Sequence, residues 1–406
     1  YIRQAVERGA VASLWQVGRP DPPQDLPLLW VDDCLAALQR LSAAWRRSLS
    51  CTVVGITGSN GKTSTKDILA GMLAAVGKTQ KTQGNYNNHI GVPLTLLSLD
   101  EDTRYAVVEM GMSAPGEIDQ LAGWVRPDVG VITSIGEAHL DKLGSLEAIA
   151  DAKWEMVRHI TPGGTLILPG DCELLRGRPI PNHLMVKTFG EEGGNSLYLK
   201  AVRATDEGVW VTTSHPVCPE LHIPMLGRHQ ALNTLAAILA ARSAGLDFAD
   251  IARGMALIQP TGGRNQLLHL GEITVLDDTY KSNPRSVAAA LDTLYLMPGS
   301  RKIFVMGDMV GLGADSEALH RRVGMLLDAR RLDALFAIGP DTRYTVDVAQ
   351  STFGARARHF DREEDLMQAL LDYARQPCTI LLKASREMRF ETLVGELQGR
   401  CLKARG

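Results

Sequence analysis

The glycine-rich segment 58–64 constrains this chain more than any other stretch, because a predicted strand leads into it and a predicted helix follows it. Its residues are Gly58, Ser59, Asn60, Gly61, Lys62, Thr63 and Ser64. The apolar run 52–56 predicts the strand, and apolar residues at helical spacing in 68–76 predict the helix. Backbone N–H groups in such a turn face one concavity, where the helix dipole favours an anion. Because Lys62 adds a cation and Thr63 a hydroxyl that can bind Mg²⁺, the segment predicts a cradle for a nucleotide triphosphate.

The match to the standard phosphate-binding pattern is incomplete. That pattern places a glycine five residues before Gly61, and Ile56 stands there. An ordinary glycine turn between a strand and a helix is the alternative interpretation. The order of strand, turn, Lys-Thr pair and helix favours the phosphate site over the ordinary turn.

Length and composition describe a globular enzyme of two or three domains. The chain has 406 residues, of which 45% are apolar and 22% charged. A net charge of −3 gives no reason to expect nucleic acid or an anionic membrane as a partner. No apolar run reaches the roughly 18 residues of a membrane-spanning helix. Six scattered cysteines suit a reducing cytoplasm, where we expect the protein to work as a monomer.

Strands and helices alternate from residue 51 onward, which predicts parallel sheets with crossover helices. The predicted strands lie near 51–57, 105–110, 128–134, 164–169, 273–277, 302–307, 333–338 and 378–383. The predicted helices lie near 62–76, 116–124, 145–160, 229–243 and 248–257. Residues 260–263 read as a hinge, and a β-rich patch covers 184–226. We therefore predict an α/β fold with domains at 51–262 and 263–406, preceded by a domain remnant at 1–50.

Acidic residues end several predicted strands, at the edge where parallel sheets bind ligands. Glu109 ends the strand at 105–110, and Asp278 ends the strand at 273–277. A carboxylate at a strand end is often only a cap for the next turn. Glu109 carries more weight, because a carboxylate beside a phosphate-binding turn can hold Mg²⁺.

Lys153 lies on an apolar stripe of the predicted helix 145–160, four residues from both Ile149 and Val157. Burial drives a lysine toward its neutral form. One interpretation is that Lys153 extends to the edge of the sheet to reach water. The other is that its neutral amine reacts with CO₂ to give a carbamate, which can bind a metal ion. His139 follows the strand at 128–134 and is either a structural residue or a metal ligand.

Together these segments resemble the Mur ligase family, the ATP-dependent amide ligases of peptidoglycan assembly. The elements that stand in the family's order are the turn 58–64, Glu109, the Gly136–His139 loop, Lys153, Asn233, Arg264 and Asp277–Tyr280. The resemblance covers nearly the whole chain. It implies a central P-loop-type ATPase domain with a parallel sheet, a Rossmann-like C-terminal domain and a truncated N-terminal α/β domain, since the chain begins at Tyr1.

The resemblance also implies roles for individual residues. Lys62 and the rest of the turn would bind the phosphates of ATP. Thr63, Glu109, His139 and carbamylated Lys153 would serve Mg²⁺, and Lys62, Glu109, His139 and Lys153 would form the catalytic set. Asn233, Arg264 and Asp278 would hold the nucleotide from the hinge and the C-terminal domain.

Within the family, the strongest resemblance is to the ligases that join D-alanyl-D-alanine to a UDP-linked muramyl tripeptide. The segments that carry it are 87–94, 109–112, 278–280, 307–309 and 382–386. The chain departs from that pattern at Lys281-Ser282 in place of Asn-Ala, at Gly311 in place of Glu, and at His89 in place of Glu. These departures leave the identity of the amine and of the third residue of the peptide open.

Other functions share part of this pattern. A folate polyglutamate ligase or another Mur ligase step would need the same turn and Lys153, but would differ in the C-terminal pocket. A non-catalytic ATP-binding scaffold would share the fold without the chemistry. A kinase that phosphorylates a hydroxyl would have no use for Lys153.

Overall fold

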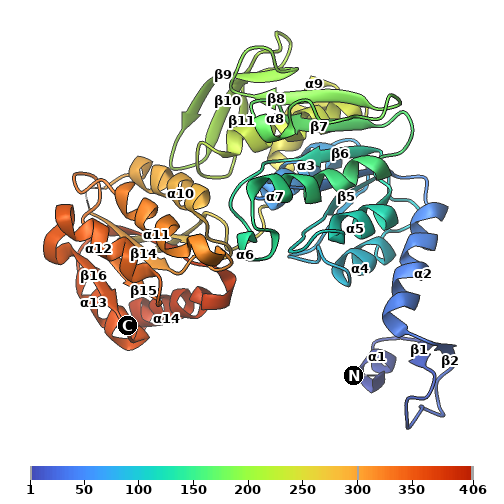
Figure 1. The fold of residues 1–406 in the computed structure, drawn as a ribbon, viewed down its shortest axis with the longest axis horizontal. Coiled ribbons are helices and arrows are strands. Elements are labelled where there is room, and N and C mark those ends of the chain that lie inside the picture. Colours follow the sequence, from blue (N-terminus) through green and yellow to red (C-terminus); the bar gives the residue numbers. More distant parts are fainter. Residues whose placement is uncertain (1, 300, 404–406) are drawn as a thin grey trace.

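The computed structural model describes residues 2–299 and 301–403, which form three sheets joined by helices (Figure 1). Near the N-terminus, α1 (Ile2–Glu7) precedes a parallel pair made by β1 (Ser13–Gln16) and β2 (Leu28–Val31). Helix α2 (Cys34–Ser48) connects this pair to the rest, and the pair projects away from the main body in Figure 1. Within the described residues, no helix is both long and apolar enough to cross a membrane.

The largest sheet has nine strands in the order β11-β10-β9-β8-β7-β6-β3-β5-β4. Their bounds are β3 Thr52–Thr57, β4 Thr79–Lys81, β5 Tyr105–Glu109, β6 Val129–Ile132, β7 Thr165–Pro169, β8 Met185–Gly190, β9 Leu197–Ala204, β10 Val209–Thr213 and β11 Leu221–Ile223. Strands β3 to β9 pair in parallel, and β10 and β11 add an antiparallel edge. The strand that precedes the glycine-rich turn, β3, therefore lies in the interior of the sheet, between β5 and β6.

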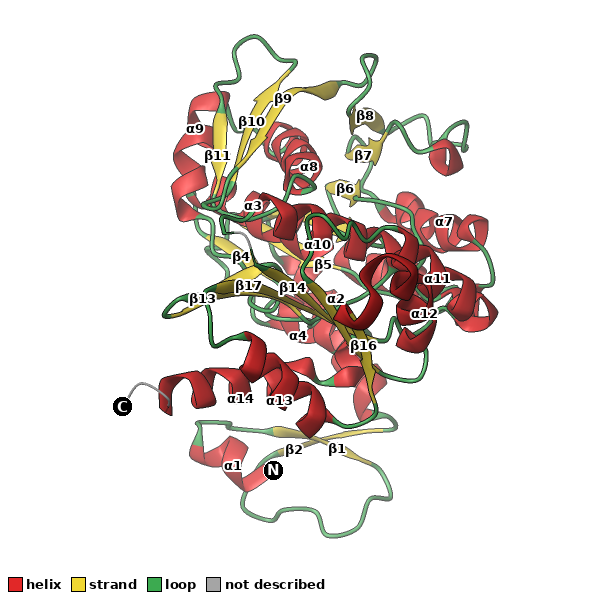
Figure 2. Ribbon diagram, turned by 90° about the vertical axis from the view of Figure 1, so that its left-hand side faces the viewer, coloured by secondary structure: helices red, strands yellow, loops and turns green. Residues whose placement is uncertain are grey.

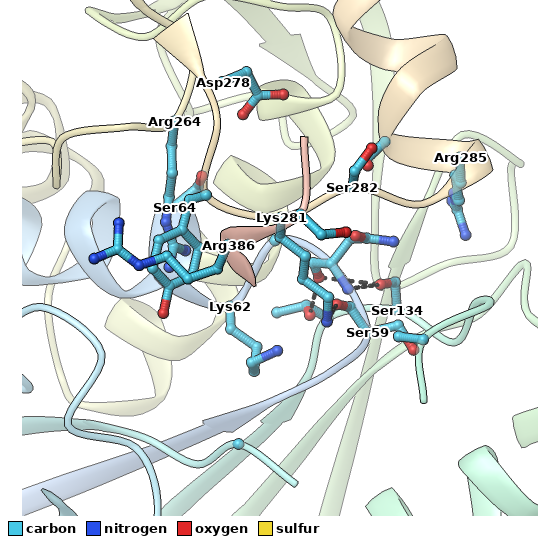
Figure 3. Close-up of a pocket in the computed structure, with 18 of the residues that line it drawn as sticks. Ser59, Lys62, Ser64, Ser134, Arg264, Asp278, Lys281, Ser282, Arg285 and Arg386 are labelled. Carbon is cyan, nitrogen blue, oxygen red and sulfur yellow. Dashed lines mark hydrogen bonds between the residues drawn. The ribbon is translucent and has the colours of Figure 1, made fainter. Parts of the chain in front are cut away.

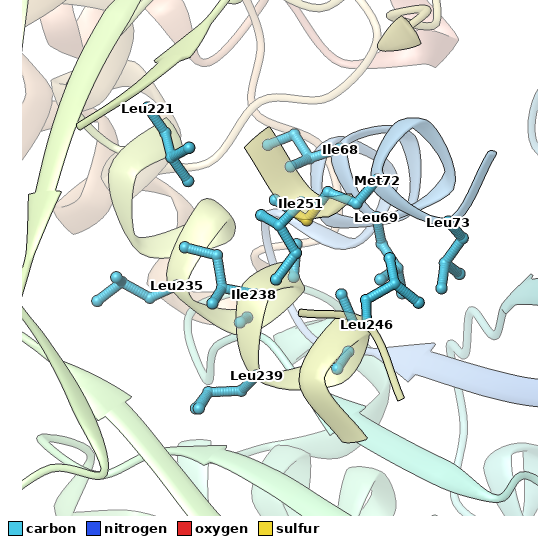
Figure 4. Close-up of a cluster of buried hydrophobic side chains, with 14 of the residues drawn as sticks. Ile68, Leu69, Met72, Leu73, Leu221, Leu235, Ile238, Leu239, Leu246 and Ile251 are labelled. Carbon is cyan, nitrogen blue, oxygen red and sulfur yellow. The ribbon is translucent and has the colours of Figure 1, made fainter. Parts of the chain in front are cut away.

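Helices cover both faces of this sheet, which explains why its central strands read as unbroken apolar runs. One face packs against α3 (Lys62–Ala74), α8 (Gln230–Ser243) and α9 (Phe248–Gly254), whose apolar side chains interlock in Figure 4. The other face packs against α4 (Gly91–Leu97), α5 (Glu117–Val125) and α7 (Leu146–Trp154), with the short α6 (Leu140–Leu143) beside α7. Two such cores hold the glycine-rich turn on a rigid base.

The third sheet has six strands in the order β12-β13-β17-β14-β15-β16, of which only β12 is antiparallel to its neighbour. Its strands are β12 Gln266–Leu270, β13 Ile273–Asp278, β14 Lys302–Gly307, β15 Ala334–Ile338, β16 Ala357–Phe360 and β17 Cys378–Lys383. Its helices are α10 Pro284–Leu296, α11 Ser316–Met325, α12 Thr342–Phe353, α13 Glu363–Tyr373 and α14 Phe390–Lys403. The first three of these helices cover one face of the sheet, and α13 and α14 cover the other (Figure 2).

The predicted α/β class, with parallel strands dominating both large sheets, is confirmed. The helix predicted at 145–160 is wrong in its last part, because the α-helix ends at Trp154 and a 3₁₀ turn continues over Glu155–His159. In this turn the Glu155 carboxylate accepts bonds from the backbone N–H groups of Gly116 and Asp119, at the start of α5. The sequence reading also missed β4, α4, β12 and β16, which are short or lie at a sheet edge, and it gave no bounds for the helices α10 to α14.

Candidate functional site

The glycine-rich turn takes the conformation that its glycines allow. Gly58 has φ +148° and Gly61 has φ +83°, and a Cβ atom on Gly61 would lie less than 3.0 Å from Asn233 Oδ1. The turn is tied to the end of β6, because the N–H of Ser59 donates to Ser134 O and that of Asn60 to Ser134 Oγ, both at 2.9 Å. These two amides are therefore engaged, contrary to the expectation that the whole turn faces an anion.

The amides that remain for an anion belong to the first turn of α3. Along α3, the first backbone N–H group that has a helical partner is that of Thr65, which donates to Gly61 O at 2.8 Å. The backbone N–H groups from Gly61 to Ser64 have no such partner within the described part of the chain, and the positive end of the helix dipole lies there. Lys62 Nζ donates to Gly58 O at 2.7 Å, across the mouth of the turn. The local geometry is that of an anion site.

Glu109, at the end of β5, lies directly beside the turn. It is 1% exposed and accepts hydrogen bonds from Thr63 Oγ1 at 2.7 Å and from Asn87 Nδ2 at 2.8 Å. Burial alone would raise the pKa of Glu109, but the positive charges of Arg264, Lys62 and Lys66 together hold it below its usual value. The carboxylate is ionised, and the Thr63 hydroxyl that it holds supplies a second hard oxygen.

His139 and Lys153 both have strongly lowered pKa values in the structure. His139 has φ +62° at the start of α6, and burial and the nearby lysines lower its pKa to about 3, so the imidazole is neutral. Lys153 is 2% exposed, and burial followed by the charges of Lys62 and Lys281 lowers its pKa well below the ordinary value. The interpretation in which Lys153 reaches water at the edge of the sheet is wrong. The described residues hold no cluster of three or more His, Cys, Asp or Glu side chains that could bind a metal ion.

The third sheet brings its own polar side chains to the same place. Asp278 ends β13 and accepts a bond from Lys383 Nζ, at the end of β17, at 2.6 Å. The Arg264 guanidinium lies 4.2 Å from the ring centroid of Tyr280, and its Nε is buried without a hydrogen-bond partner. Asn233 comes from α8, where its Nδ2 donates to Gln230 Oε1 at 2.9 Å.

Direct contacts join the third sheet to the turn. Lys281 Nζ donates to Ser59 O at 3.3 Å, and Asn283 Nδ2 donates to Asn60 Oδ1 at 2.9 Å. A salt bridge of 2.7 Å between Arg322 and Glu137 lies on the same boundary. The segment that follows β13 thus closes against the glycine-rich turn.

The predicted hinge contacts the helix that follows the turn. The N–H of Thr261 donates to Asp67 Oδ2 at 2.8 Å, and Asp67 is buried in α3. Lys81 Nζ bridges the two by donating to Asp67 Oδ1 at 2.6 Å and to Gln259 O at 2.9 Å. Movement of the hinge is therefore linked mechanically to α3.

These groups line one cavity of about 520 Å³, within the size range of small-molecule sites (Figure 3). The predicted site residues that line it are Ser59, Asn60, Gly61, Lys62, Ser64, Glu109, His139, Asn233, Arg264 and Asp278. The others, Gly58, Thr63 and Lys153, are not part of this lining, although Thr63 bonds to the lining residue Glu109. In Figure 3, Lys62 and Lys281 lie near each other, below Asp278 and Arg264.

Sequence reasoning missed several polar residues at this site. Ser134 follows β6 directly, and Lys383 ends a buried strand, so the strand-end rule applied to Glu109 could have found both. Asn87 and Asp67 gave no comparable signal, because their roles depend on contacts between segments far apart in the chain. Lys281 was noted only as a departure from a pattern.

Known proteins share this arrangement. The Mur ligase middle domain matches residues 56–241, and the glutamate ligase domain of Mur ligases matches residues 263–386. The UDP-N-acetylmuramoyl-tripeptide–D-alanyl-D-alanine ligase of Bacillus subtilis is 38% identical over 400 residues, covering 98% of this chain and 87% of the relative.

Solved structures agree with this similarity. The crystal structure of MurF from Acinetobacter baumannii has a TM-score of 0.87 at 31% identity, covering 98% of this chain and 87% of its own. The MurF ligase of Thermotoga maritima in complex with ADP has a TM-score of 0.84 at 27% identity, covering 99% of this chain and 92% of its own. On the combined similarity of sequence and fold, this chain belongs to the Mur ligase family.

Proposed function

We propose that the chain is an ATP-dependent ligase that joins D-alanyl-D-alanine to a UDP-N-acetylmuramoyl-tripeptide in the synthesis of peptidoglycan precursors. The observation that carries this proposal is the single cavity in which the turn of α3, Glu109 and the ends of β13 and β17 meet. The names of the relatives supply the substrates. We assign the work to a monomer in the cytoplasm, the compartment that the cysteine usage suggested.

The hydrogen-bond donors of the cavity fit ATP. A Cβ at Gly58 or Gly61 would clash with Thr133 or Asn233, so glycine lets the turn pack closely, and within the described residues the N–H groups from Gly61 to Ser64 have no partner and are available to an anion. The buried, unpartnered Nε of Arg264 is a further donor that lacks an acceptor. We propose that the turn 58–64 binds the phosphates, and that Asn233, Arg264 and Asp278 hold the rest of the nucleotide.

Mg²⁺ also fits the residues present. The Thr63 hydroxyl and the Glu109 carboxylate are buried oxygens within hydrogen-bond distance of each other, and Mg²⁺ prefers oxygen ligands. Neutral His139 is available as a nitrogen ligand. When bound, the ion would neutralise charge on the phosphates.

Lys153 supports a carbamate at the same site. Its amine is buried, and the neighbouring cations Lys62 and Lys281 also favour the neutral form. A neutral amine attacks the carbon of CO₂, forms the N–C bond and loses a proton, leaving a carboxylate. That anion would offset the surrounding positive charge and complete an oxygen-rich site with Glu109 and His139.

The reaction follows from these placements. A carboxylate oxygen of the muramyl peptide attacks the γ-phosphorus of ATP, while the bond to the β–γ bridging oxygen breaks and ADP leaves. Lys62 would spread the charge that develops on the transferred group. The amine then attacks the acyl phosphate through a tetrahedral oxyanion, a proton leaves the nitrogen, and phosphate departs.

Three domains divide this work in our proposal. Residues 51–262 bind ATP, and residues 263–406 bring the amine and part of the nucleotide site. Residues 1–50 belong to a domain for the uridine nucleotide. Closing about the hinge 260–263 would hold both substrates together and exclude water, which supplies the proximity contribution to the rate.

A product assay tests the proposal. The enzyme is incubated with ATP, UDP-linked muramyl tripeptides that differ in their third residue, and either D-alanyl-D-alanine or other amines. A ligase of this kind releases phosphate only when both the peptide and the amine are present, and yields a product heavier by one D-alanyl-D-alanine unit less water. Phosphorylation of a hydroxyl without the amine would indicate a kinase, and ATP binding without any product would indicate a scaffold.

A further inference from the structure

Lys281 is a half-buried lysine at the boundary between the third sheet and the glycine-rich turn. Its side chain comes from the segment after β13, and its Nζ lies 3.3 Å from Ser59 O. Lys62 and Arg264 are the cations that act on it most strongly. We propose that Lys281 binds the transferred phosphoryl group of ATP, as a cation that the C-terminal sheet carries to the phosphate site. This inference rests on the proposed function.

The backbone of Lys281 is fixed from two sides. Lys383, 1% exposed, donates to Lys281 O at 2.8 Å while it also bonds Asp278. Two residues further on, Asn283 caps α10 by accepting from the N–H of Ser286, and its amide reaches Asn60. The Lys281 side chain is therefore held in one direction, toward the turn.

The cations around Lys281 outweigh the carboxylates that act on it. Within the described residues no salt bridge of Lys281 is present, although carboxylates pair with Lys383 and Lys81 nearby. Burial, followed by the charges of Lys62 and Arg264, lowers the pKa of Lys281 to about 7, with Glu109 and Glu387 acting in the opposite direction. A polyphosphate in the turn would supply the missing negative charge and restore the ammonium form.

In our proposal the C-terminal sheet makes phosphoryl transfer depend on closure. The ammonium is in place only while the segment after β13 lies against the turn. The carboxylate oxygen bonds to the γ-phosphorus while the bond from that phosphorus to the β–γ bridging oxygen breaks, and the electron pair of the broken bond stays on ADP. Lys281 stabilises the equatorial oxygens of the phosphoryl group during this transfer.

A comparison of nucleotides in binding calorimetry tests this role. Lys281→Met should weaken the binding of a non-hydrolysable ATP analogue about tenfold or more and change that of ADP less than about twofold, because only the analogue carries the γ-phosphate. The rate of ligation at saturating ATP should fall about 10²-fold or more, as when one charge-stabilising donor is removed from an active site. Lys281→Arg should regain part of the affinity for the ATP analogue and part of the ligation rate.

Controls separate this role from a structural one. Lys142→Met removes an exposed cation of α6 near His139 and should leave both affinities and the rate unchanged. If Lys281→Met lowers the midpoint of thermal unfolding substantially, the same binding and rate measurements are made with Lys281→Gln instead. Equal loss of ADP and analogue affinity, or no loss of either, would overturn the assignment of Lys281. A wild-type enzyme that binds neither nucleotide would instead refute the proposed function.

Discussion

Adding one methyl group at Gly61 tests whether Asn233 is packed against the phosphate-binding turn. Gly61 precedes α3 with φ +83° and ψ −9°, and a Cβ there would meet Asn233 Oδ1. Gly116 precedes α5 with nearly the same angles, φ +82° and ψ −15°, and a Cβ there would have nothing within 4 Å. Gly61→Ala and Gly116→Ala therefore share the cost of the left-handed backbone and differ in the clash.

The structure gives the expected size of each effect. Placing alanine in the left-handed region costs about 1–2 kcal/mol of unfolding free energy, which both variants lose. Gly61→Ala also forces the Asn233 amide away and breaks its bond to Gln230, which costs about 1 kcal/mol more. We expect urea denaturation to show Gly61→Ala as the less stable variant by roughly that difference. Binding of ATP should weaken only in Gly61→Ala, because only there does the turn shift.

A second background isolates the clash. In an Asn233→Ala protein the side chain that clashes with residue 61 is gone. Gly61→Ala should then lower the free energy of unfolding by no more than Gly116→Ala does in the wild type. Equal urea midpoints for Gly61→Ala and Gly116→Ala in the wild-type background would refute the reasoning. An unchanged cost of Gly61→Ala after removal of the Asn233 side chain would refute it as well.

Four further predictions concern the charged groups of the site. Lys62→Ala should abolish ATP-dependent phosphate release while circular dichroism shows an intact fold, because it removes the cation beside the turn. Lys153→Ala should lose most activity and regain part of it with added short-chain carboxylates in a ligation assay, whereas Lys153→Arg should not be rescued; full activity of the alanine variant would contradict the carbamate. Asp278→Ala and Arg264→Ala should mainly raise the apparent KM for ATP in steady-state kinetics, and unchanged values in both would mean that they do not hold the nucleotide. His229 lies just before α8 and also lines the cavity. His229→Gln should flatten the loss of stability between pH 6.5 and 4 in urea titrations, because burial lowers the pKa of His229 to about 4, so that only the unfolded chain binds its proton in that window.

Most strands of both large sheets, and the helices of the first of them, could be read from local pattern. Apolar runs such as 302–307 and 378–383 are buried on both faces, so their composition identifies them without knowledge of their neighbours. The turn 58–64 was recognisable for the same reason, because its chemistry lies within one short segment. Helical spacing placed Lys153 on the apolar side of α7, but only the structure showed that its side chain is buried.

What the sequence determined by itself was therefore local: most strands, the helices of the first large sheet, the glycine-rich turn and the apolar face on which Lys153 lies. The tertiary structure alone decided which residues meet. Lys281 and Asn283 reach the turn, and Asp67 holds the hinge, through contacts between residues nearly two hundred or more positions apart. Such contacts depend on how two sheets are placed against each other. That placement is set by the summed packing of many side chains and leaves no signature in the spacing of any one segment.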